Sequence, residues 1–178
     1  NLIVVEWDIS KANLIDEKVY EIIEKMGKID ILVNNSGIYA PNSFFNTDEK
    51  LFDEIMNTNL KGLFFTSKKI SEYFINNSIK GKIINIGSVR SFQGGSEAYG
   101  ISKWGVRGLT QGLARDLIKH GIVVNAVAPG ITATGINGIN IQNNAYSSSS
   151  LDSRVAIPEE IAEKGKIYDK MLVLKLKF

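Results

Sequence analysis

The sequence predicts an α/β fold, in which parallel strands form one sheet and helices connect successive strands. Short apolar runs alternate along the chain with longer segments whose apolar residues recur every three or four positions. Each longer segment has the length needed for a crossover between parallel strands. The strands are expected at residues 2–5, 29–33, 82–86 and 122–128. The expected architecture is a doubly wound parallel sheet, which binds ligands beyond the carboxyl ends of its strands.

The composition indicates one globular domain, covering residues 1–178, with a sizeable core. Of the 178 residues, 44% are hydrophobic and 22% are charged, as is ordinary for a folded domain. Acidic and basic residues are interspersed and the net charge is +2, so we expect no surface for nucleic acid or for an anionic membrane. No apolar run reaches the roughly 18 residues of a membrane span.

The sequence lacks cysteine and has a single histidine, His120. Disulfides, thiolate catalysis and cysteine-ligated metals are thereby excluded, and one histidine cannot build a histidine metal cluster or a Ser-His-Asp triad. We therefore predict no metal site. A cysteine-free chain without a charged-then-apolar leader fits a soluble protein of the reducing cytoplasm.

Two crossover helices are predicted in the first half of the chain. The first ends at Gly27. Its apolar stripe consists of Ile15, Val19, Ile22, Ile23 and Met26. The second begins after Thr47, which can cap it, and its apolar pattern continues to about Asn76. Asn57 and Asn59 interrupt this pattern, and a local kink is expected there because asparagine competes for backbone hydrogen bonds.

The segment 83–103 combines features that point to chemistry. It opens as a strand, breaks at Gly87, carries Ser88, crosses a glycine-rich loop and enters a helix. On that helix Tyr99 and Lys103 are four residues apart, so the phenol and the ammonium lie on one face. A nearby cation favours the phenolate, which makes a tyrosine a better proton shuttle at neutral pH. Ser88 could hydrogen-bond an oxygen whose charge changes during a reaction. Alone, Tyr-x-x-x-Lys is also common in helices without any catalytic role.

Polar and turn-forming residues follow directly on the predicted strands. They are Asp8, the segment from Asn34 to Gly37, Ser88 and Pro129-Gly130. The segment from Asn34 to Gly37 is either a structural turn or a loop on which a ligand sits, since glycine allows close backbone approach.

The last quarter of the chain has weaker patterns. Residues 134–157 are poor in apolar periodicity and rich in Asn, Gly and Ser, which favours a flexible surface segment, either a substrate lid or a plain loop. Pro158 suits the first turn of a helix, and residues 166–178 can make a short strand.

Together these motifs resemble those of the short-chain dehydrogenase/reductase family, over about residues 8–161. Asn34-Asn35-Ser36-Gly37 is similar to the family's Asn-Asn-Ala-Gly motif, and Asn59 matches its catalytic asparagine. Ser88, Tyr99 and Lys103 match its serine, tyrosine and lysine. The run from Pro129 to Thr134 resembles the Pro-Gly segment around the nicotinamide. Each motif is weak by itself, and their common order is what indicates the family.

The resemblance implies a Rossmann-like fold and an NAD(P)-dependent oxidoreductase. Hydride would pass between the nicotinamide of NAD or NADP and a carbonyl or secondary-alcohol carbon, with Tyr99 as the general acid/base. Lys103 would lower the pKa of the phenol and hold the nicotinamide ribose. Ser88 would polarise the substrate oxygen, and Asn59 would fix a water linked to Lys103.

The resemblance also implies a set of site residues and partners. The expected catalytic residues are Asn59, Ser88, Tyr99 and Lys103. The expected cofactor-binding residues are Asp8, Ile9, Asn35, Ser36, Gly37, Tyr99, Lys103, Pro129, Gly130, Ile131 and Thr134. A small-molecule alcohol or ketone is the expected substrate, and a homo-oligomer, tetramer or dimer, is expected to form through the long helices. Nucleic acid and membrane are not expected partners.

Two departures from the family's pattern leave a second interpretation open. Family members begin with a strand, a glycine-rich loop and a helix that hold the pyrophosphate, and this first βαβ unit is absent here. The end of the chain after Lys164 is atypical as well. We therefore expect a truncated member of the family. The alternative is a non-catalytic remnant that serves as an oligomerisation or binding module, while an epimerase or dehydratase is disfavoured by the Asn34–Gly37 motif and Asn59.

Overall fold

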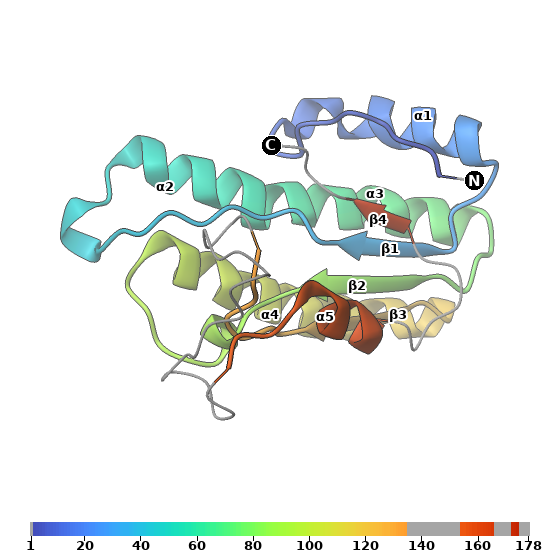
Figure 1. Cartoon of the computed structure of the whole chain (residues 1–178). Helices are drawn as coiled ribbons and strands as arrows, with labels where there is room; N and C mark the ends of the chain where they lie inside the picture. The colour runs from blue at the N-terminus through green and yellow to red at the C-terminus, as the bar shows by residue number, and fades with distance from the viewer. Residues whose placement is uncertain (1, 135–153, 166–171, 175–178) are drawn as a thin grey trace.

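The computed structural model describes residues 2–134, 154–165 and 172–174. These residues form a four-stranded parallel sheet in the order β3-β2-β1-β4 (Figure 1). The strands are Ile31–Asn34 (β1), Lys82–Ile86 (β2), Val123–Val127 (β3) and Leu172–Leu174 (β4). The helices are Ile15–Met26 (α1), Glu49–Met56 (α2), Leu63–Asn76 (α3), Ala98–Leu117 (α4) and Pro158–Gly165 (α5).

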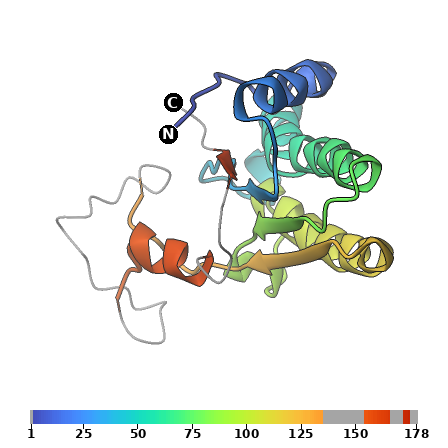
Figure 2. The same ribbon diagram turned by 90° about the vertical axis from the view of Figure 1, so that its right-hand side faces the viewer.

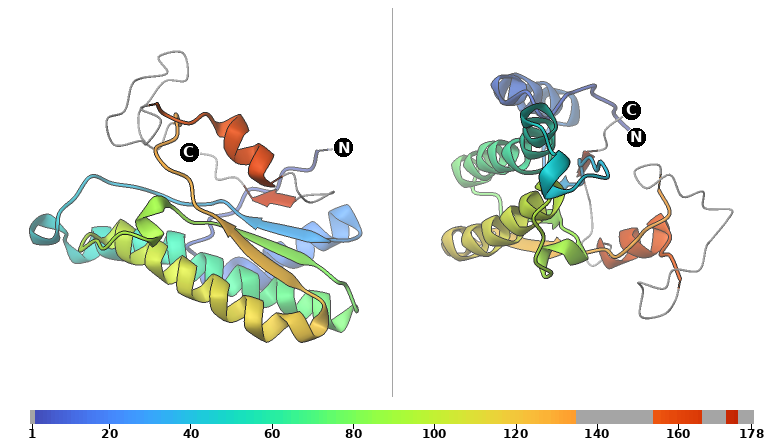
Figure 3. Two further views of the ribbon diagram at one scale, coloured as in Figure 1. Left: turned by 90° about the horizontal axis from the view of Figure 1, so that it is seen from below. Right: turned by 90° about the vertical axis from the view of Figure 1, so that its left-hand side faces the viewer.

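The helices lie on both faces of the sheet, which confirms the predicted α/β fold. Figure 2 shows α1, α3 and α4 on one face and α5 on the other. The two long helices, α3 and α4, run beside each other along the same face (Figure 3). In a parallel sheet that is covered on both faces, apolar side chains are expected on both sides of its strands.

The core follows the alternation of side chains along the strands. Leu32, Ile83 and Val124 point toward the helices and join a buried cluster. The helical members of that cluster are Ile15, Val19 and Ile22 of α1, Ile70 and Phe74 of α3, and Leu117 of α4. On the opposite face, Ile31, Val33 and Ile84 form a smaller cluster. Alternate apolar residues of β1 and β2 therefore belong to the clusters on opposite faces of the sheet.

The predicted second crossover helix forms with the expected interruption. Between α2 and α3 the chain makes a π-helical turn, Asn57–Gly62, at the two asparagines. The N-cap prediction is wrong by one residue. Asp48 caps α2, because its carboxylate accepts a hydrogen bond from the Leu51 N–H (2.8 Å), while the Thr47 hydroxyl donates to the Ser43 carbonyl (2.6 Å).

The predicted first strand, residues 2–5, is not a strand in the structure. Leu2 and Val4 are 91% and 77% exposed, so this apolar run is not buried either. A strand needs a neighbour to receive its backbone hydrogen bonds. Within the described residues, β1 is flanked by β2 and β4, and the segment 2–5 pairs with neither.

The C-terminal predictions are tested only in part. The helix starting at Pro158 and a short strand in the tail are present as α5 and β4. The predicted flexible segment, 134–157, falls mostly on residues 135–153, which lie outside the described residues. Within the described ranges, no helix combines the length and apolar character that crossing a membrane requires.

Candidate active site

The carboxyl ends of β1, β2 and β3 meet at one edge of the sheet, where most of the predicted site residues lie. The Gly87 N–H donates to the Val127 carbonyl (2.8 Å), and the Val89 N–H donates to the Pro129 carbonyl (2.9 Å). These two bonds hold the turn that carries Ser88 against the Pro129-Gly130 segment. The predicted substrate-side serine and the predicted nicotinamide segment are thus neighbours.

Lys103 is buried on α4 at the end of β2. Its Nζ donates to the Ile86 carbonyl (2.8 Å) and lies 5.7 Å from the centroid of the Tyr99 ring. The side chain is 6% exposed, and this burial lowers its pKa to about 8. Burial disfavours the charged form of a lysine, which the bond to a carbonyl offsets only in part. The ammonium is therefore held in place but titrates closer to neutrality than an exposed lysine does.

Tyr99 is half-buried and lies one helical turn before Lys103. Burial raises its pKa, a hydrogen bond with the Ser88 side chain lowers it, Tyr39 raises it and Arg90 lowers it, and the net direction is upward. The Tyr39 ring meets the Tyr99 ring edge to face, with centroids 5.1 Å apart. The sequence predicted a lowered pKa, and that direction is wrong for this structure. The effect of burial on the pKa exceeds the lowering by Ser88 and Arg90. The four-residue spacing of Tyr99 and Lys103 does not reveal how buried the phenol is.

Ser88 belongs to a tight turn that is fixed to α4. Its hydroxyl oxygen accepts from the Arg90 N–H (3.2 Å), and its own N–H donates to the Ser91 hydroxyl (3.2 Å). The Ser91 hydroxyl in turn donates to the carbonyl of Lys103 (2.9 Å). The serine turn is therefore hydrogen-bonded to the backbone of Lys103, the residue whose side chain supplies the ammonium.

Asn59 lies in the π-helical turn and is 1% exposed. Its Oδ1 accepts from the Ile38 N–H (2.8 Å), and its Nδ2 donates to the Ile38 carbonyl (2.9 Å). Nδ2 also donates to the Ser102 hydroxyl (3.2 Å) on α4. The π-helical turn thus brings the asparagine into contact with both the loop after β1 and α4.

Asn35, Ser36 and Gly37 form the loop after β1, next to Lys103. A Cβ built on Gly37 would lie 3.5 Å from Asn59 Oδ1 and 3.7 Å from Lys103 Nζ. The glycine leaves this space free in front of an ammonium that has three N–H donors, one of them bonded to Ile86. An ammonium with N–H donors left over is a group that a ligand hydroxyl can accept from, so the chemistry of Lys103 is compatible with a ribose.

The other predicted cofactor residues lie in two regions, after β3 and before α1. Pro129, Gly130 and Ile131 continue from β3 beside the serine turn, and Thr134 follows with its hydroxyl 3.5 Å from the Thr132 carbonyl. Asp8 instead caps the turn before α1, where its carboxylate accepts from the Ser10 hydroxyl (2.7 Å). Ile9 is buried, and its carbonyl oxygen lies against Gly62, where an added Cβ would be 2.5 Å away.

Sequence reasoning missed four residues that contact this site. Tyr39 packs on Tyr99, Ser102 binds Asn59, and Arg90 forms an ion pair with Glu97 (2.9 Å) across the loop between Ser88 and Tyr99. The positions of Arg90 and Glu97, near the two ends of a glycine-containing loop, are a signal that could have suggested the ion pair. The position of Ser102 beside Lys103 and one turn after Tyr99 could likewise have marked it.

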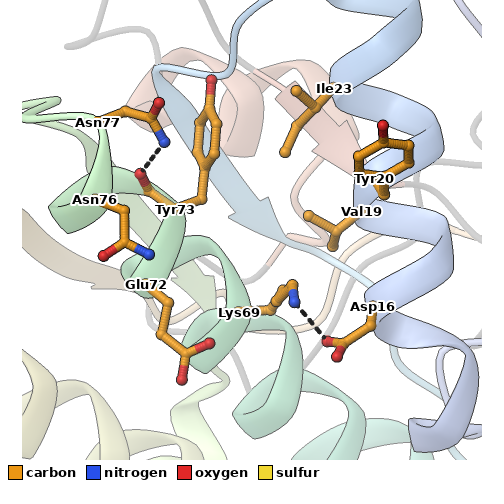
Figure 4. A pocket seen from close by; sticks show the side chains of 9 residues that line it. All are labelled: Asp16, Val19, Tyr20, Ile23, Lys69, Glu72, Tyr73, Asn76 and Asn77. Atoms are coloured by element: carbon orange, nitrogen blue, oxygen red, sulfur yellow. Dashed lines mark hydrogen bonds and ion pairs between the residues drawn. The ribbon is translucent and has the colours of Figure 1, made fainter.

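A surface hollow of about 270 Å³ is formed by α1 and α3 and includes the Lys69–Asp16 ion pair (3.0 Å) (Figure 4). None of its lining residues is a predicted site residue. Across the described ranges, no three histidine, aspartate or glutamate side chains gather into a group that could hold a metal ion.

Comparisons with known proteins match this geometry. The family model for short chain dehydrogenases matches residues 1–145. The chain is 45% identical over 129 residues to a 2-dehydro-3-deoxy-D-gluconate 5-dehydrogenase from Dickeya dadantii, covering 71% of this chain and 50% of that protein. It is 39% identical over 167 residues to an L-2,3-butanediol dehydrogenase from Corynebacterium glutamicum, covering 85% of this chain and 64% of that protein.

Solved structures give the same result. A 3-ketoacyl-(acyl-carrier-protein) reductase from Brucella melitensis, complexed with NADH, superposes with a TM-score of 0.80 at 28% identity, covering 90% of this chain and 67% of that one. The chain spans about half the length of the Dickeya dadantii relative. Since the family model covers most of its residues and the fold agrees, the chain belongs to the short-chain dehydrogenase/reductase family.

Proposed function

We propose that this chain is the substrate and nicotinamide half of an NAD(P)-dependent oxidoreductase that interconverts a secondary alcohol and a carbonyl. The observation that carries the proposal is the joint placement of Ser88, Tyr99 and Lys103 at the carboxyl ends of β2 and β3. The Ser88 side chain is close enough to the Tyr99 phenol to lower its pKa, and Lys103 Nζ lies 5.7 Å from the centroid of the Tyr99 ring. A relative named as a dehydrogenase and a reductase structure complexed with NADH support the same reaction class.

The bound nicotinamide would supply the hydride, and the chain's own residues would handle the proton. The raised pKa of Tyr99 keeps the phenol protonated at neutral pH, which suits the donation of a proton to a carbonyl oxygen. Ser88 would bind the same oxygen and orient it toward the phenol. Lys103 would hold the ribose hydroxyls across the Gly37 gap, and its charge would stabilise the phenolate left after the proton transfer.

Asn59 would act through structure and solvent. Its carboxamide fixes the Ile38 backbone, and the preceding residue Gly37 lies beside Lys103 Nζ. We expect a water near this loop to carry protons between Lys103 and solvent. Asn35, Ser36, Pro129, Gly130, Ile131 and Thr134 remain predicted contacts of the cofactor, as do Asp8 and Ile9, and residues 134–157 a predicted substrate loop.

The proposed substrate is a small hydroxy or keto compound. The relatives include proteins named for 2-dehydro-3-deoxy-D-gluconate and for L-2,3-butanediol, both of which carry secondary alcohols or ketones. A cytoplasmic location also stays a prediction, drawn from the cysteine-free composition.

The first experiment is a titration of NADH and NADPH onto the purified chain, followed by nicotinamide fluorescence, and then turnover with 2,3-butanediol and acetoin. We expect saturable binding of one dinucleotide and turnover that Tyr99→Phe removes. Tyr73→Phe, on α3, is the control and should leave both unchanged. Turnover that survives in Tyr99→Phe would contradict the proton role.

A second candidate function is self-association, which exposed aromatic residues favour. Phe64, Phe65 and Trp104 on α3 and α4 are 44%, 38% and 43% exposed. Phe44, Phe52 and Ile101 line a hollow of about 350 Å³ beside α2 and α4. Apolar side chains gathered on neighbouring helices often mark an interface. We propose that two or four copies pair through this surface.

Light scattering on the purified chain tests self-association. The expected result is a dimer or tetramer that Phe64→Glu converts to a monomer, while Tyr20→Glu on α1 leaves the mass unchanged. A monomeric wild-type chain would overturn this proposal without touching the oxidoreductase one.

A further inference from the structure

Ser102 is completely buried in α4 and is the residue between the Tyr99 turn and Lys103. Its hydroxyl donates to the carbonyl of Tyr99 (2.7 Å). Since a serine hydroxyl has one proton, the remaining capacity of this oxygen is to accept. It accepts from Nδ2 of Asn59 (3.2 Å), which comes from a segment 43 residues earlier in the chain.

The Asn59 carboxamide binds two residues, and both of its N–H protons are used. A backbone N–H can only donate, so the bond from Ile38 fixes the carboxamide with Oδ1 toward Ile38 (2.8 Å). One Nδ2 proton then goes to the Ile38 carbonyl (2.9 Å) and the other to Ser102 (3.2 Å). Reversing the amide would place an acceptor against Ser102, whose only proton already serves Tyr99. Ser102 therefore selects the orientation of Asn59 that also binds Ile38.

This chain of bonds joins three segments around Lys103. It runs from α4 through the π-helical turn to the loop after β1, where Gly37 lies beside both Asn59 and Lys103 Nζ. A second contact supports the same joint, because a Cβ on Gly105 would lie 2.6 Å from the Leu60 side chain. The glycine allows the π-helical turn to sit directly on α4, at the distance that the Ser102–Asn59 bond requires.

We infer that Ser102 is a positioning residue whose hydroxyl holds the Asn59 carboxamide, and through it the Gly37–Ile38 loop, in place against the Tyr99–Lys103 turn of α4. The proposal rests on the proposed function only for its effect on turnover. The structural claim is that Ser102 holds the Ile38 backbone in place through Asn59. This claim can be tested without measuring any reaction.

The test is amide hydrogen exchange of the ¹⁵N-labelled chain, measured by NMR for Ser102→Ala. We expect the Ile38 amide to exchange about tenfold faster than in wild type, because the carboxamide that accepts from it loses its anchor. The Ile84 amide in β2 should change by less than about twofold. The Asn59 side-chain proton bonded to Ser102 should also move toward the position of a free amide.

Ser71→Ala is the matched control. Ser71 is a buried serine of α3 whose hydroxyl donates to the carbonyl of Ser67 (2.7 Å), so it loses the same kind of helical bond without touching Asn59. It should leave the Ile38 rate unchanged relative to Ile84. Equal acceleration of Ile38 and Ile84 in Ser102→Ala would reduce Ser102 to a packing residue and overturn the proposal.

A second variant covers the case in which Ser102→Ala does not fold. Ser102→Cys has the same shape with a slightly larger side chain and replaces the hydroxyl by a weak donor and acceptor. It is judged by the same ratio of Ile38 to Ile84 exchange. A raised ratio supports the positioning role, and an unchanged ratio contradicts it. If dinucleotide binding fails in all chains, the exchange result still decides this proposal, while the proposed function falls separately.

Discussion

The two sides of the candidate site are held by different kinds of interaction. On the inner side, Asn59, Ser102 and Lys103 are buried, and each binds a backbone carbonyl. On the outer side, Tyr99 meets the exposed Tyr39 ring, and the half-exposed Arg90 side chain pairs with Glu97, whose side chain is 14% exposed. Buried hydrogen bonds cost about 1–3 kcal/mol when one partner is lost, whereas an ion pair that water reaches on one side contributes about 0–1 kcal/mol. The inner side therefore fixes geometry, and the outer side adjusts the proton affinity of Tyr99.

The largest effect is expected from Asn59→Ala, on the inner side. The substitution leaves the N–H and the carbonyl of Ile38 without their partner in a partly buried loop, so we expect a loss of about 3 kcal/mol in unfolding free energy. Chemical denaturation measures it. Asn57→Ala, in the same π-helical turn, is the control and should cost less than about 0.5 kcal/mol. Equal losses for both would mean that the turn, not the carboxamide, matters.

Lys103→Met should remove a pH dependence of stability. The folded-state pKa of Lys103, about 8, lies below its ordinary value of 10.5. Between these values the unfolded chain binds more protons, so stability rises with pH, by about 2 kcal/mol from about pH 7.5 to about 9.5. Urea unfolding across this range should show the rise in wild type and in Lys68→Met, an exposed control. A rise that persists in Lys103→Met would show that another group causes it.

Glu97→Gln tests the outer side. The loss of an ion pair with a half-exposed arginine should cost less than about 1 kcal/mol. The pKa of Tyr99 should fall, because the Arg90 charge beside the phenol loses its counter-ion. Ultraviolet titration, with the Tyr99→Phe spectrum subtracted, follows the phenolate. Glu72→Gln on α3 serves as control, and a Tyr99 pKa that rises or stays constant would contradict the assignment.

The smallest effect is expected from Tyr39→Phe. The edge-to-face ring contact remains, so stability should change by only a few tenths of a kcal/mol, about the size of a surface substitution. The pKa of Tyr99 should fall, since the Tyr39 phenol is one of the groups that raise it. The same titration measures the shift, with Tyr20→Phe for comparison. A larger loss of stability than in Asn59→Ala would reverse the contrast between the two sides.

Local periodicity made part of this site predictable. The four-residue spacing of Tyr99 and Lys103 on a helix, and the interruption at Asn57 and Asn59, both depend on neighbouring residues, and the structure confirms them as α4 and the π-helical turn. The end of β2 at Ile86 follows from its apolar run in the same way, and β1, predicted to end at Val33, ends one residue later at Asn34.

Features that depend on distant partners could not be predicted. Residues 2–5 have the composition of a strand but no neighbour that pairs with them among the described residues. The bond between Ser102 and Asn59 spans 43 residues, and neither residue alone signals it. The direction of the Tyr99 pKa shift depends on burial by the surrounding chain, which a single helical turn cannot reveal.

The π-helical turn Asn57–Gly62 makes this helix sensitive to its residue count. A π-turn holds one residue more than an α-turn, so deleting one residue here would restore a regular α-helix. The helical turns on either side would keep their relative orientation, so Ile55 would stay buried in α2. The wide turn that places Asn59 against Ile38 and Ser102 would be lost. A single-codon deletion there would therefore leave the core of the helix intact and disrupt the site.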